Sequence, residues 1–255
     1  MVAMQHFSSF DGIRIAYLDE GDGPCVLLLH GFAADHHANW VAPGVVEALL
    51  AAGYRVLAPD ARGHGASDKP YDPEAYSGDA MVRDARALLD HVGVDSSAVA
   101  GYSMGALTSS QLVPVEPRAR TLVLGGIGAR TSSRRMAGWR EEIAAGLLAE
   151  DPRSITHPAA RAFRRFADRT GADRRALAAI QQSQRMRGVS VAEIAVPTLV
   201  IVGDADTLAG DPQELADKIP GAIAKVIKGD HLNAVFDPAF RNSIVEFFGR
   251  AMAPR

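Results

Sequence analysis

The sequence predicts an α/β protein with a mostly parallel sheet of eight strands, helices on both faces and a small helical cap. Three observations lead to this expectation. Short, continuously apolar runs alternate with amphipathic helical segments, as in sheets whose strands are buried on both faces. Glycine, proline and cap residues separate these segments. One arginine-rich helical stretch interrupts the alternation, and 255 residues with 47% hydrophobic composition suffice for one large core.

Eight segments have the length and composition of strands. The first two flank Asp11-Gly12, a strong hairpin signal, so we expect an antiparallel pair at one edge of the sheet. The later runs are typical of buried, parallel strands. In chain order the expected strands are residues 5–10, 13–18, 25–29, 54–58, 97–100, 121–124, 198–202 and 222–227.

Helices are expected in the segments between these strands. Gly53 and Gly93 end the first two, because glycine readily adopts the left-handed conformation that follows a helix. Asp237-Pro238 combines a cap residue with a proline suited to the first turn, and it opens the last helix. The expected helices are residues 45–50, 74–92, 106–113, 212–219 and the segment from 238 onward.

Residues 130–195 differ in composition from the rest of the chain. They contain 13 arginines, no lysine and seven acidic residues. Asp151-Pro152 and His157-Pro158 divide the segment into short helices. We therefore predict a core domain of residues 1–129 and 196–255 with a helical cap inserted as residues 130–195. Solvated ion pairs explain most of the arginines, and a basic lid for carboxylate-bearing substrates is the alternative.

Composition and charge favour small-molecule chemistry. With a net charge of −3, the chain lacks the overall excess of basic residues that favours nucleic-acid binding. We therefore predict a small-molecule substrate and no nucleic-acid partner. The oligomeric state stays open. No run approaches the roughly 18 apolar residues of a membrane span, and no secretory signal opens the chain. We therefore expect a cytoplasmic protein without membrane insertion. The single cysteine, Cys25, lies in an apolar run as a small buried residue, which excludes an intrachain disulfide.

The segment Gly101-Tyr102-Ser103-Met104-Gly105 fits the nucleophile-elbow pattern G-x-S-x-G. A predicted strand precedes it and a predicted helix follows it, which is the context that the pattern requires. A serine in such a strained turn presents its hydroxyl to a substrate. An ordinary turn can also hold a serine between two glycines. The pentapeptide alone therefore does not distinguish a catalytic serine from an ordinary turn, and the rest of the sequence is needed.

A serine hydroxyl becomes nucleophilic at neutral pH only beside a base that a carboxylate orients. His231 follows the last predicted strand, and Gly203-Asp204-Ala205-Asp206 follows the strand before it. Groups at the carboxyl ends of parallel strands collect at one edge of the sheet, so we expect these residues to meet Ser103 there. Their chain order is Ser, Asp, His.

These features resemble the α/β-hydrolase fold superfamily, here with an inserted cap. The resemblance extends over essentially the whole chain. It rests on five segments in the expected order, namely His30-Gly31-Phe32, the loop of residues 60–67, the serine pentapeptide 101–105, residues 203–206 and Asp230-His231. The combination is specific for fold and triad and leaves the substrate open.

The resemblance implies a role for each matching residue. Ser103 corresponds to the nucleophile and His231 to the general base and acid. Asp206 corresponds to the carboxylate that orients the histidine, with Asp204 as the alternative. The backbone N–H groups of Phe32 and Met104 correspond to the donors of the oxyanion hole.

Other residues near these groups are candidates for lining the substrate pocket, with core packing as the alternative for those in the cap. They are His36, Tyr102, Met136, Trp139 and Leu232. No cofactor is needed, and the adjacent His36 and His37 lack carboxylate or cysteine partners, so we predict no metal site. Asp60 and Arg62 are expected to pair and hold their loop.

We therefore expect a serine hydrolase that cleaves a carboxylic ester, thioester or lactone through an acyl-enzyme. C–C bond hydrolysis and cofactor-free haloperoxidase or perhydrolase chemistry are compatible with the same triad. A ligand-sensing protein with slow or no turnover is the alternative from another class. The resemblance also implies that haloalkane dehalogenases and epoxide hydrolases of this fold carry aspartate at the position of Ser103, which argues against those two activities.

Overall fold

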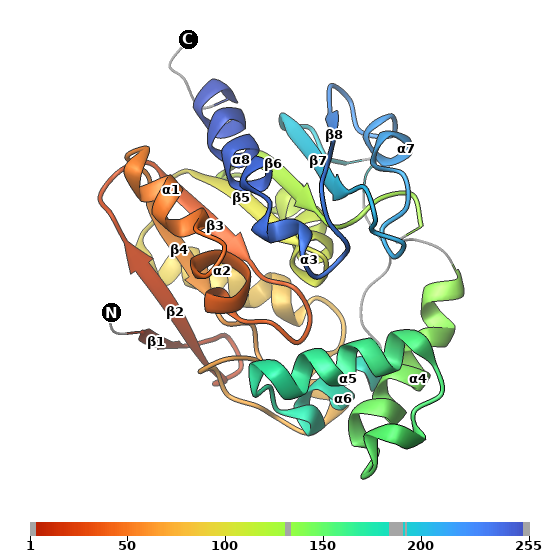
Figure 1. The fold of residues 1–255 in the computed structure, drawn as a ribbon. Coiled ribbons are helices and arrows are strands. Elements are labelled where there is room, and N and C mark those ends of the chain that lie inside the picture. Colours follow the sequence, from red (N-terminus) through yellow and green to blue (C-terminus); the bar gives the residue numbers. More distant parts are fainter. Residues whose placement is uncertain (1–3, 131–133, 184–190, 192, 252–255) are drawn as a thin grey trace.

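The computed structural model describes residues 4–130, 134–183, 191 and 193–251, with the side chains of 134–137 left out. Its strands are β1 (Gln5–Ser8), β2 (Arg14–Glu20), β3 (Cys25–Leu29), β4 (Arg55–Pro59), β5 (Ser97–Tyr102), β6 (Ala119–Gly125), β7 (Thr198–Gly203) and β8 (Ile223–Ile227). They form one sheet in the order β1-β2-β4-β3-β5-β6-β7-β8 (Figure 1). Only the β1–β2 and β2–β4 pairs are antiparallel. The predicted eight-stranded, mostly parallel fold is confirmed.

The helices are α1 (Val45–Ala51), α2 (Ala80–Val92), α3 (Met104–Leu112), α4 (Arg134–Leu148), α5 (Pro158–Thr170), α6 (Arg174–Gln182), α7 (Pro212–Ala216) and α8 (Pro238–Ala251). The helix predicted over residues 74–92 is divided, because a short 3₁₀ turn at Pro73–Tyr76 precedes α2. Gly78 lies between them at φ +60°, a left-handed conformation that interrupts a helix.

Both faces of the sheet are buried away from its two edge strands, since side chains of β2 to β7 alternate between two hydrophobic clusters. In β3, Leu27 and Leu29 pack with α2 and α3 on one face, while Val26 and Leu28 pack with α1 and α8 on the other. Cys25 belongs to the first cluster, and burial raises the pKa of its thiol to about 12. The continuously apolar sequence of this strand follows directly from its two covered faces.

Helices α4, α5 and α6 follow β6 in the chain and precede β7, and they form a group beside the sheet (Figure 1). Their apolar residues, among them Leu147, Leu177 and Ile180, form a third cluster that also includes Phe32 and Met104 from the main body. This cluster joins the helical group to the edge of the sheet at which the serine turn lies. The cap limits at residues 130 and 195 stay a prediction.

In the described part of the chain, no helix combines the length and apolar character that crossing a bilayer requires.

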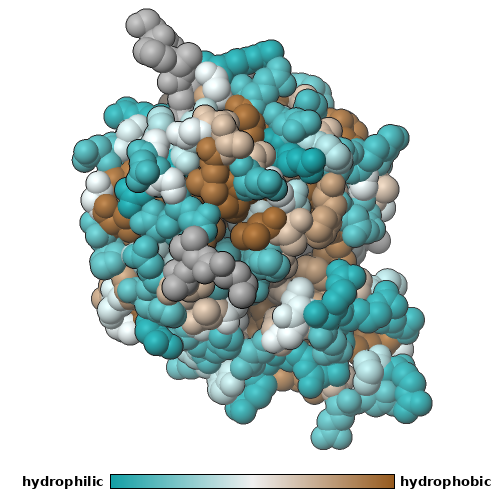
Figure 2. Space-filling model, turned by 60° about the vertical axis from the view of Figure 1, so that its left-hand side comes forward, coloured by the Kyte–Doolittle hydropathy of each residue, from teal (hydrophilic) through white to brown (hydrophobic). Residues whose placement is uncertain are grey.

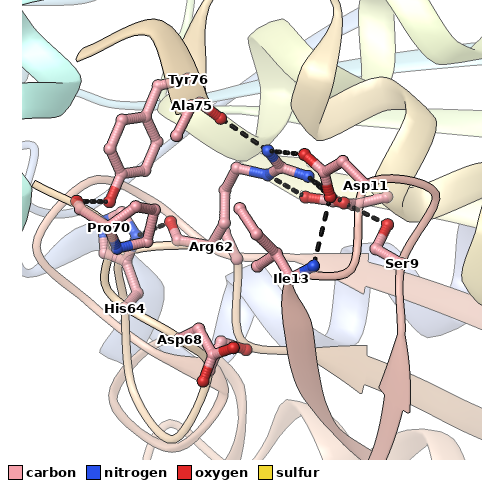
Figure 3. Close-up of polar contacts among 12 residues, drawn as sticks. Ser9, Asp11, Ile13, Arg62, His64, Asp68, Pro70, Ala75 and Tyr76 are labelled. Carbon is pink, nitrogen blue, oxygen red and sulfur yellow. Dashed lines mark hydrogen bonds and ion pairs between the residues drawn. The ribbon is translucent and has the colours of Figure 1, made fainter. Parts of the chain in front are cut away.

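A buried guanidinium fastens the amino-terminal hairpin to the rest of the fold. The side chain of Arg62 is fully buried, and it donates to both carboxylate oxygens of Asp84 on α2 at 2.6 Å. It also donates to Asp11 in the β1–β2 turn at 2.9 Å and to the Ala75 carbonyl at 2.6 Å (Figure 3). Ser9 Oγ donates to Asp84 as well. Four separate chain segments therefore meet on this group.

The predicted pairing of Asp60 with Arg62 is wrong. The oxygens of Asp60 accept hydrogen bonds from His36 and from the Ala66 amide, so this carboxylate is already occupied. Asp84, distant in sequence, offers Arg62 two parallel hydrogen bonds, the geometry that a guanidinium matches best. Nearness in the sequence therefore did not identify the carboxylate that pairs with Arg62.

We predict that Asp84→Asn lowers the free energy of unfolding by about 3 kcal/mol, because it leaves a buried guanidinium without its main counter-charge. Urea titration followed by circular dichroism measures this change. Arg153→Ala is the matched control, since it removes an ion pair whose arginine side chain is 90% exposed, and it should cost less than about 1 kcal/mol. Equal losses for the two variants would contradict the prediction.

Candidate active site

Ser103 occupies a sharp turn between β5 and α3. Its backbone has φ +51° and ψ −108°, and its amide donates to the Gly125 carbonyl at 2.8 Å. A Cβ at Gly101 would collide with the backbone of Gly105, and one at Gly105 would collide with the carbonyl of Leu29. Both flanking positions of the pentapeptide therefore require glycine, and the strained serine is held between them.

A continuous hydrogen-bond chain connects Ser103 to a buried carboxylate. Ser103 Oγ lies 2.8 Å from His231 Nε2, and His231 Nδ1 lies 2.7 Å from Asp206 Oδ2. The second oxygen of Asp206 accepts from the amides of Leu208 at 2.9 Å and Ala209 at 3.0 Å. A carboxylate at Nδ1 favours the tautomer with its proton there, which leaves Nε2 free to accept from the serine.

The second acid that the sequence offered, Asp204, lies outside this chain. Its side chain is exposed and pairs with Lys228 Nζ at 2.6 Å, and it also accepts from the Gly229 amide. Asp206 has a fully buried side chain and faces His231. The two carboxylates are two residues apart, and only the second reaches the imidazole.

Tyr102 anchors the loop that carries His231. Its hydroxyl donates to the His231 carbonyl at 2.8 Å. Burial, with the charges of Asp206 and Asp230, raises the pKa of Tyr102 well above its usual range, so the phenol remains a donor. A Cβ at Gly126 would press on the Tyr102 ring, so the glycine after β6 leaves room for this side chain.

The loop after β3 lies beside the serine. Ala33 has φ +62°, and Ala33 and Ser103 are the two non-glycine residues with positive φ in the described part of the chain. Asn39 Oδ1 accepts from the Gly31 amide at 2.8 Å, and His64 Nε2 accepts from the Ala33 amide at 3.2 Å. Strain and side-chain hydrogen bonds thus define the backbone on both sides of Phe32. Met104 is the first residue of α3, so its N–H has no acceptor within that helix.

His36 does not line the cavity at Ser103, which corrects the prediction. Asp60 Oδ1 accepts from the His36 backbone amide at 2.9 Å and contacts its Nδ1 at 2.8 Å, so the ring is held toward the loop after β4. Burial lowers the pKa of His36, but the bond to Asp60 and the charges of Asp60 and Asp35 outweigh it, and the pKa is raised. Burial raises the pKa of Asp60, but the histidine contacts outweigh it and hold this pKa well below its usual range.

A cavity of about 430 Å³ opens at Ser103, a volume typical of small-molecule sites. Tyr102 and Leu232 line it, together with Phe163, Arg169 and Thr170 of α5, and their role in holding a substrate stays a prediction. Hydrophobic residues border a hollow on one face of the molecule, within a largely hydrophilic surface (Figure 2).

Trp139 lines a second cavity, of about 480 Å³, instead of the first. Phe163, His231 and Leu232 border both cavities, and Ser103 borders only the first. The predicted lining residue Met136 lies outside the residues whose side chains the structure describes. Among the described residues, no group of three His, Cys, Asp or Glu side chains is arranged to hold a metal ion.

The sheet order, the serine turn after β5 and the acid and histidine after β7 and β8 define the α/β-hydrolase fold. The chain has this fold, and the family model of the α/β hydrolase fold matches residues 24–146, slightly less than half of the chain.

Solved structures with the same fold match nearly the whole chain. A hydrolase from Pseudomonas aeruginosa PA01 is 29% identical, with a TM-score of 0.81 over 96% of this chain and 98% of that one. An esterase from Thermogutta terrifontis is 26% identical, with a TM-score of 0.80 over 98% and 99%.

Curated relatives match a shorter stretch. Epoxide hydrolase 2 of Siraitia grosvenorii is 37% identical over 99 residues, which is 39% of this chain and 30% of that protein. The match therefore spans less than a third of the relative's length.

We predict that the stability supplied by the His36–Asp60 pair depends on pH. Because the folded-state pKa of His36 is raised, its contribution is full below the unfolded pKa of about 6.5 and declines as pH rises through the folded value. The lowered pKa of Asp60 makes the unfolding free energy depend on pH only in stronger acid, where this carboxylate takes up a proton. The loss of unfolding free energy in His36→Gln should therefore be larger at about pH 5.5 than at about pH 9.

Chemical denaturation of both proteins at each pH measures this difference. His37→Gln is the control, because it removes the neighbouring exposed imidazole, which lies outside the bond to Asp60. A loss for His36→Gln that is the same at both pH values argues against a charged pair.

Proposed function

We propose that this protein is a serine hydrolase that cleaves a carboxylic ester, or the related thioester or lactone, through an acyl-enzyme. The proposal gives Ser103 the role of nucleophile, His231 that of general base and acid, and Asp206 that of orienting carboxylate. The observation that carries it is the hydrogen-bond chain from buried Asp206 through His231 to Ser103 Oγ at the cavity.

In the proposed reaction, Ser103 Oγ attacks the substrate carbonyl while His231 Nε2 takes its proton. The tetrahedral intermediate collapses, its bond to the leaving oxygen breaks, and the imidazolium returns the proton to the departing alcohol. Water then attacks the acyl-serine with the same assistance and releases the acid. Asp206 steadies the imidazolium throughout, and two backbone N–H bonds hold its carboxylate in place.

The charge on the intermediate requires donors that are already in position. We assign them to the backbone N–H groups of Phe32 and Met104, and removing one such donor costs on the order of 3 kcal/mol in other enzymes. The strained backbone at Ala33 and the helix start at Met104 support this assignment. The positive end of α3 adds a favourable field at the same point.

Ester chemistry is favoured over epoxide opening, although curated relatives are epoxide hydrolases. Epoxide hydrolases of this fold carry aspartate as nucleophile, and this chain has Ser103 at that place. A serine that is hydrogen-bonded to a histidine base is suited to attack on an acyl carbon. The esterase of similar structure supports the same substrate class.

We expect Ser103→Ala to reduce kcat for 4-nitrophenyl butyrate by at least about 10⁴-fold with unchanged thermal stability, because the covalent route is lost. Spectrophotometric release of nitrophenolate measures the rate. In parallel, a fluorophosphonate probe should label the wild-type protein on the peptide that contains Ser103. Undiminished hydrolysis by the variant would falsify the assignment, and negligible turnover of the wild type across an ester panel favours a ligand sensor instead.

The roles of the two neighbouring acids can be separated in a second experiment. Asp206→Asn should lower kcat by about 10⁴-fold, because an amide at His231 Nδ1 no longer stabilises the imidazolium or selects the tautomer. Asp204→Asn, its matched control, should change kcat by less than about tenfold, since that side chain pairs with an exposed lysine. A larger loss for Asp204→Asn than for Asp206→Asn contradicts the proposed triad.

A further inference from the structure

We propose that Arg169 binds a carboxylate on the acyl part of the substrate, so that the preferred substrates are esters or lactones of dicarboxylic acids. This inference rests on the proposed function and names its substrate class. It begins with the charge of the cavity at Ser103. Among the described residues that line this cavity, Arg169 is the one with a permanent charge, and none carries a carboxylate.

Arg169 is set apart from the other described arginines of the helical group. Arg164 is buried against Asp168, Arg174 lies beside the same carboxylate, and Arg140 donates to two backbone carbonyls. Of the described arginines of α4, α5 and α6, Arg169 alone lines the cavity, and no carboxylate lies within ion-pair distance of it in the described part of the chain. Its guanidinium is therefore available to an anion that enters.

The position of Arg169 relative to the serine is fixed by its neighbours. It lies in the last turn of α5, and the next residue, Thr170, donates through Oγ1 to the Ala33 carbonyl at 3.0 Å. Nearly two turns earlier on the same helix, Phe163 packs edge-on against Phe32 at 5.5 Å between ring centroids. The end of α5 is thus attached to the loop beside the proposed oxyanion hole.

The guanidinium itself is partly oriented. The Cζ atom of Arg169 lies 5.2 Å from the centre of the Phe166 ring, which also lines the cavity. Stacking on an aromatic face leaves the N–H edges of a guanidinium free to form two parallel hydrogen bonds with a carboxylate. Because Arg169 is exposed and lines the cavity, it lies where the cavity meets solvent. The anion would therefore occupy the outer end, with apolar walls between it and Ser103.

The two cavities indicate which half of the substrate carries the charge. The acyl group stays covalently on Ser103, and only the cavity with Arg169 includes that residue. The second cavity borders His231, which protonates the leaving group in the proposed reaction, and its described lining residues include Asp230 but no arginine. A leaving alcohol fits the second cavity, and an acyl chain that ends in a carboxylate fits the first.

The test compares 4-nitrophenyl half-esters of glutaric, adipic and suberic acid with the matching primary amides, which have the same size without the charge. For at least one chain length, wild-type kcat/KM should favour the anion, and Arg169→Gln should lower the anion-to-amide ratio by about 10- to 100-fold. Arg169→Lys, which keeps the charge, should retain part of the preference. Arg165→Gln is the matched control, since it removes an exposed arginine of the same helix that does not line the cavity.

A binding measurement separates this inference from the proposed function. Calorimetric titration of glutarate, adipate and suberate into Ser103→Ala, and into the same variant with Arg169→Gln, needs no turnover. Ester hydrolysis with equal ratios for Arg169→Gln and Arg165→Gln would overturn the anion site alone. Absent hydrolysis with Arg169-dependent dicarboxylate binding would overturn the ester assignment and retain the anion site.

Discussion

The geometry of the site depends on the strained turn at Ser103. A serine at φ +51° is unfavourable by itself, and close backbone packing on both sides compensates for it. The carbonyls of Leu29 and Gly105 approach so closely that only glycine fits at positions 105 and 101. The strands β3 and β5 and the helix α3 are therefore in direct backbone contact at this point, and any shift of one of them would move the serine hydroxyl.

Separate contacts fix the positions of His231 and of the loop after β3. Asp206 fixes the imidazole of His231 at Nδ1, and Tyr102 fixes its backbone carbonyl, so ring and loop are held independently. The residue that precedes Ser103 thus secures the loop that carries His231. On the other side of the serine, the loop after β3 depends on Asp60, whose carboxylate connects it to the loop after β4.

The helical group of α4, α5 and α6 supplies one wall of the cavity at Ser103. Thr170 and Phe163 attach α5 to the loop after β3, and this attachment completes the wall of the cavity. The residues proposed to react and the residue proposed to select the substrate therefore belong to different parts of the chain. The superfamily varies its reactions in the same way, since one fold accommodates many sites.

Much of the fold could be predicted because its signals are local. The run Cys25–Leu29 is apolar on both faces, the Asp237-Pro238 cap opens α8 where expected, and strand ends differ from prediction by at most two residues. The serine pentapeptide was recognisable for a similar reason, since close backbone packing leaves glycine as the residue that fits on each side. The chain order of serine, acids and histidine followed from strand ends that meet at one edge.

Pairings between distant segments could not be predicted in this way. Arg62 pairs with Asp84 and Asp11 and leaves Asp60 to His36, because three-dimensional proximity, not spacing in the chain, decides which carboxylate a buried cation reaches. The 13 arginines of residues 130–195 look alike in sequence, and only the packing of α5 distinguishes Arg169. The sequence by itself determined the elements, their order and the chemical types at the site. The tertiary structure decided which of those groups touch, since contacts and burial depend on how whole helices and loops are packed together.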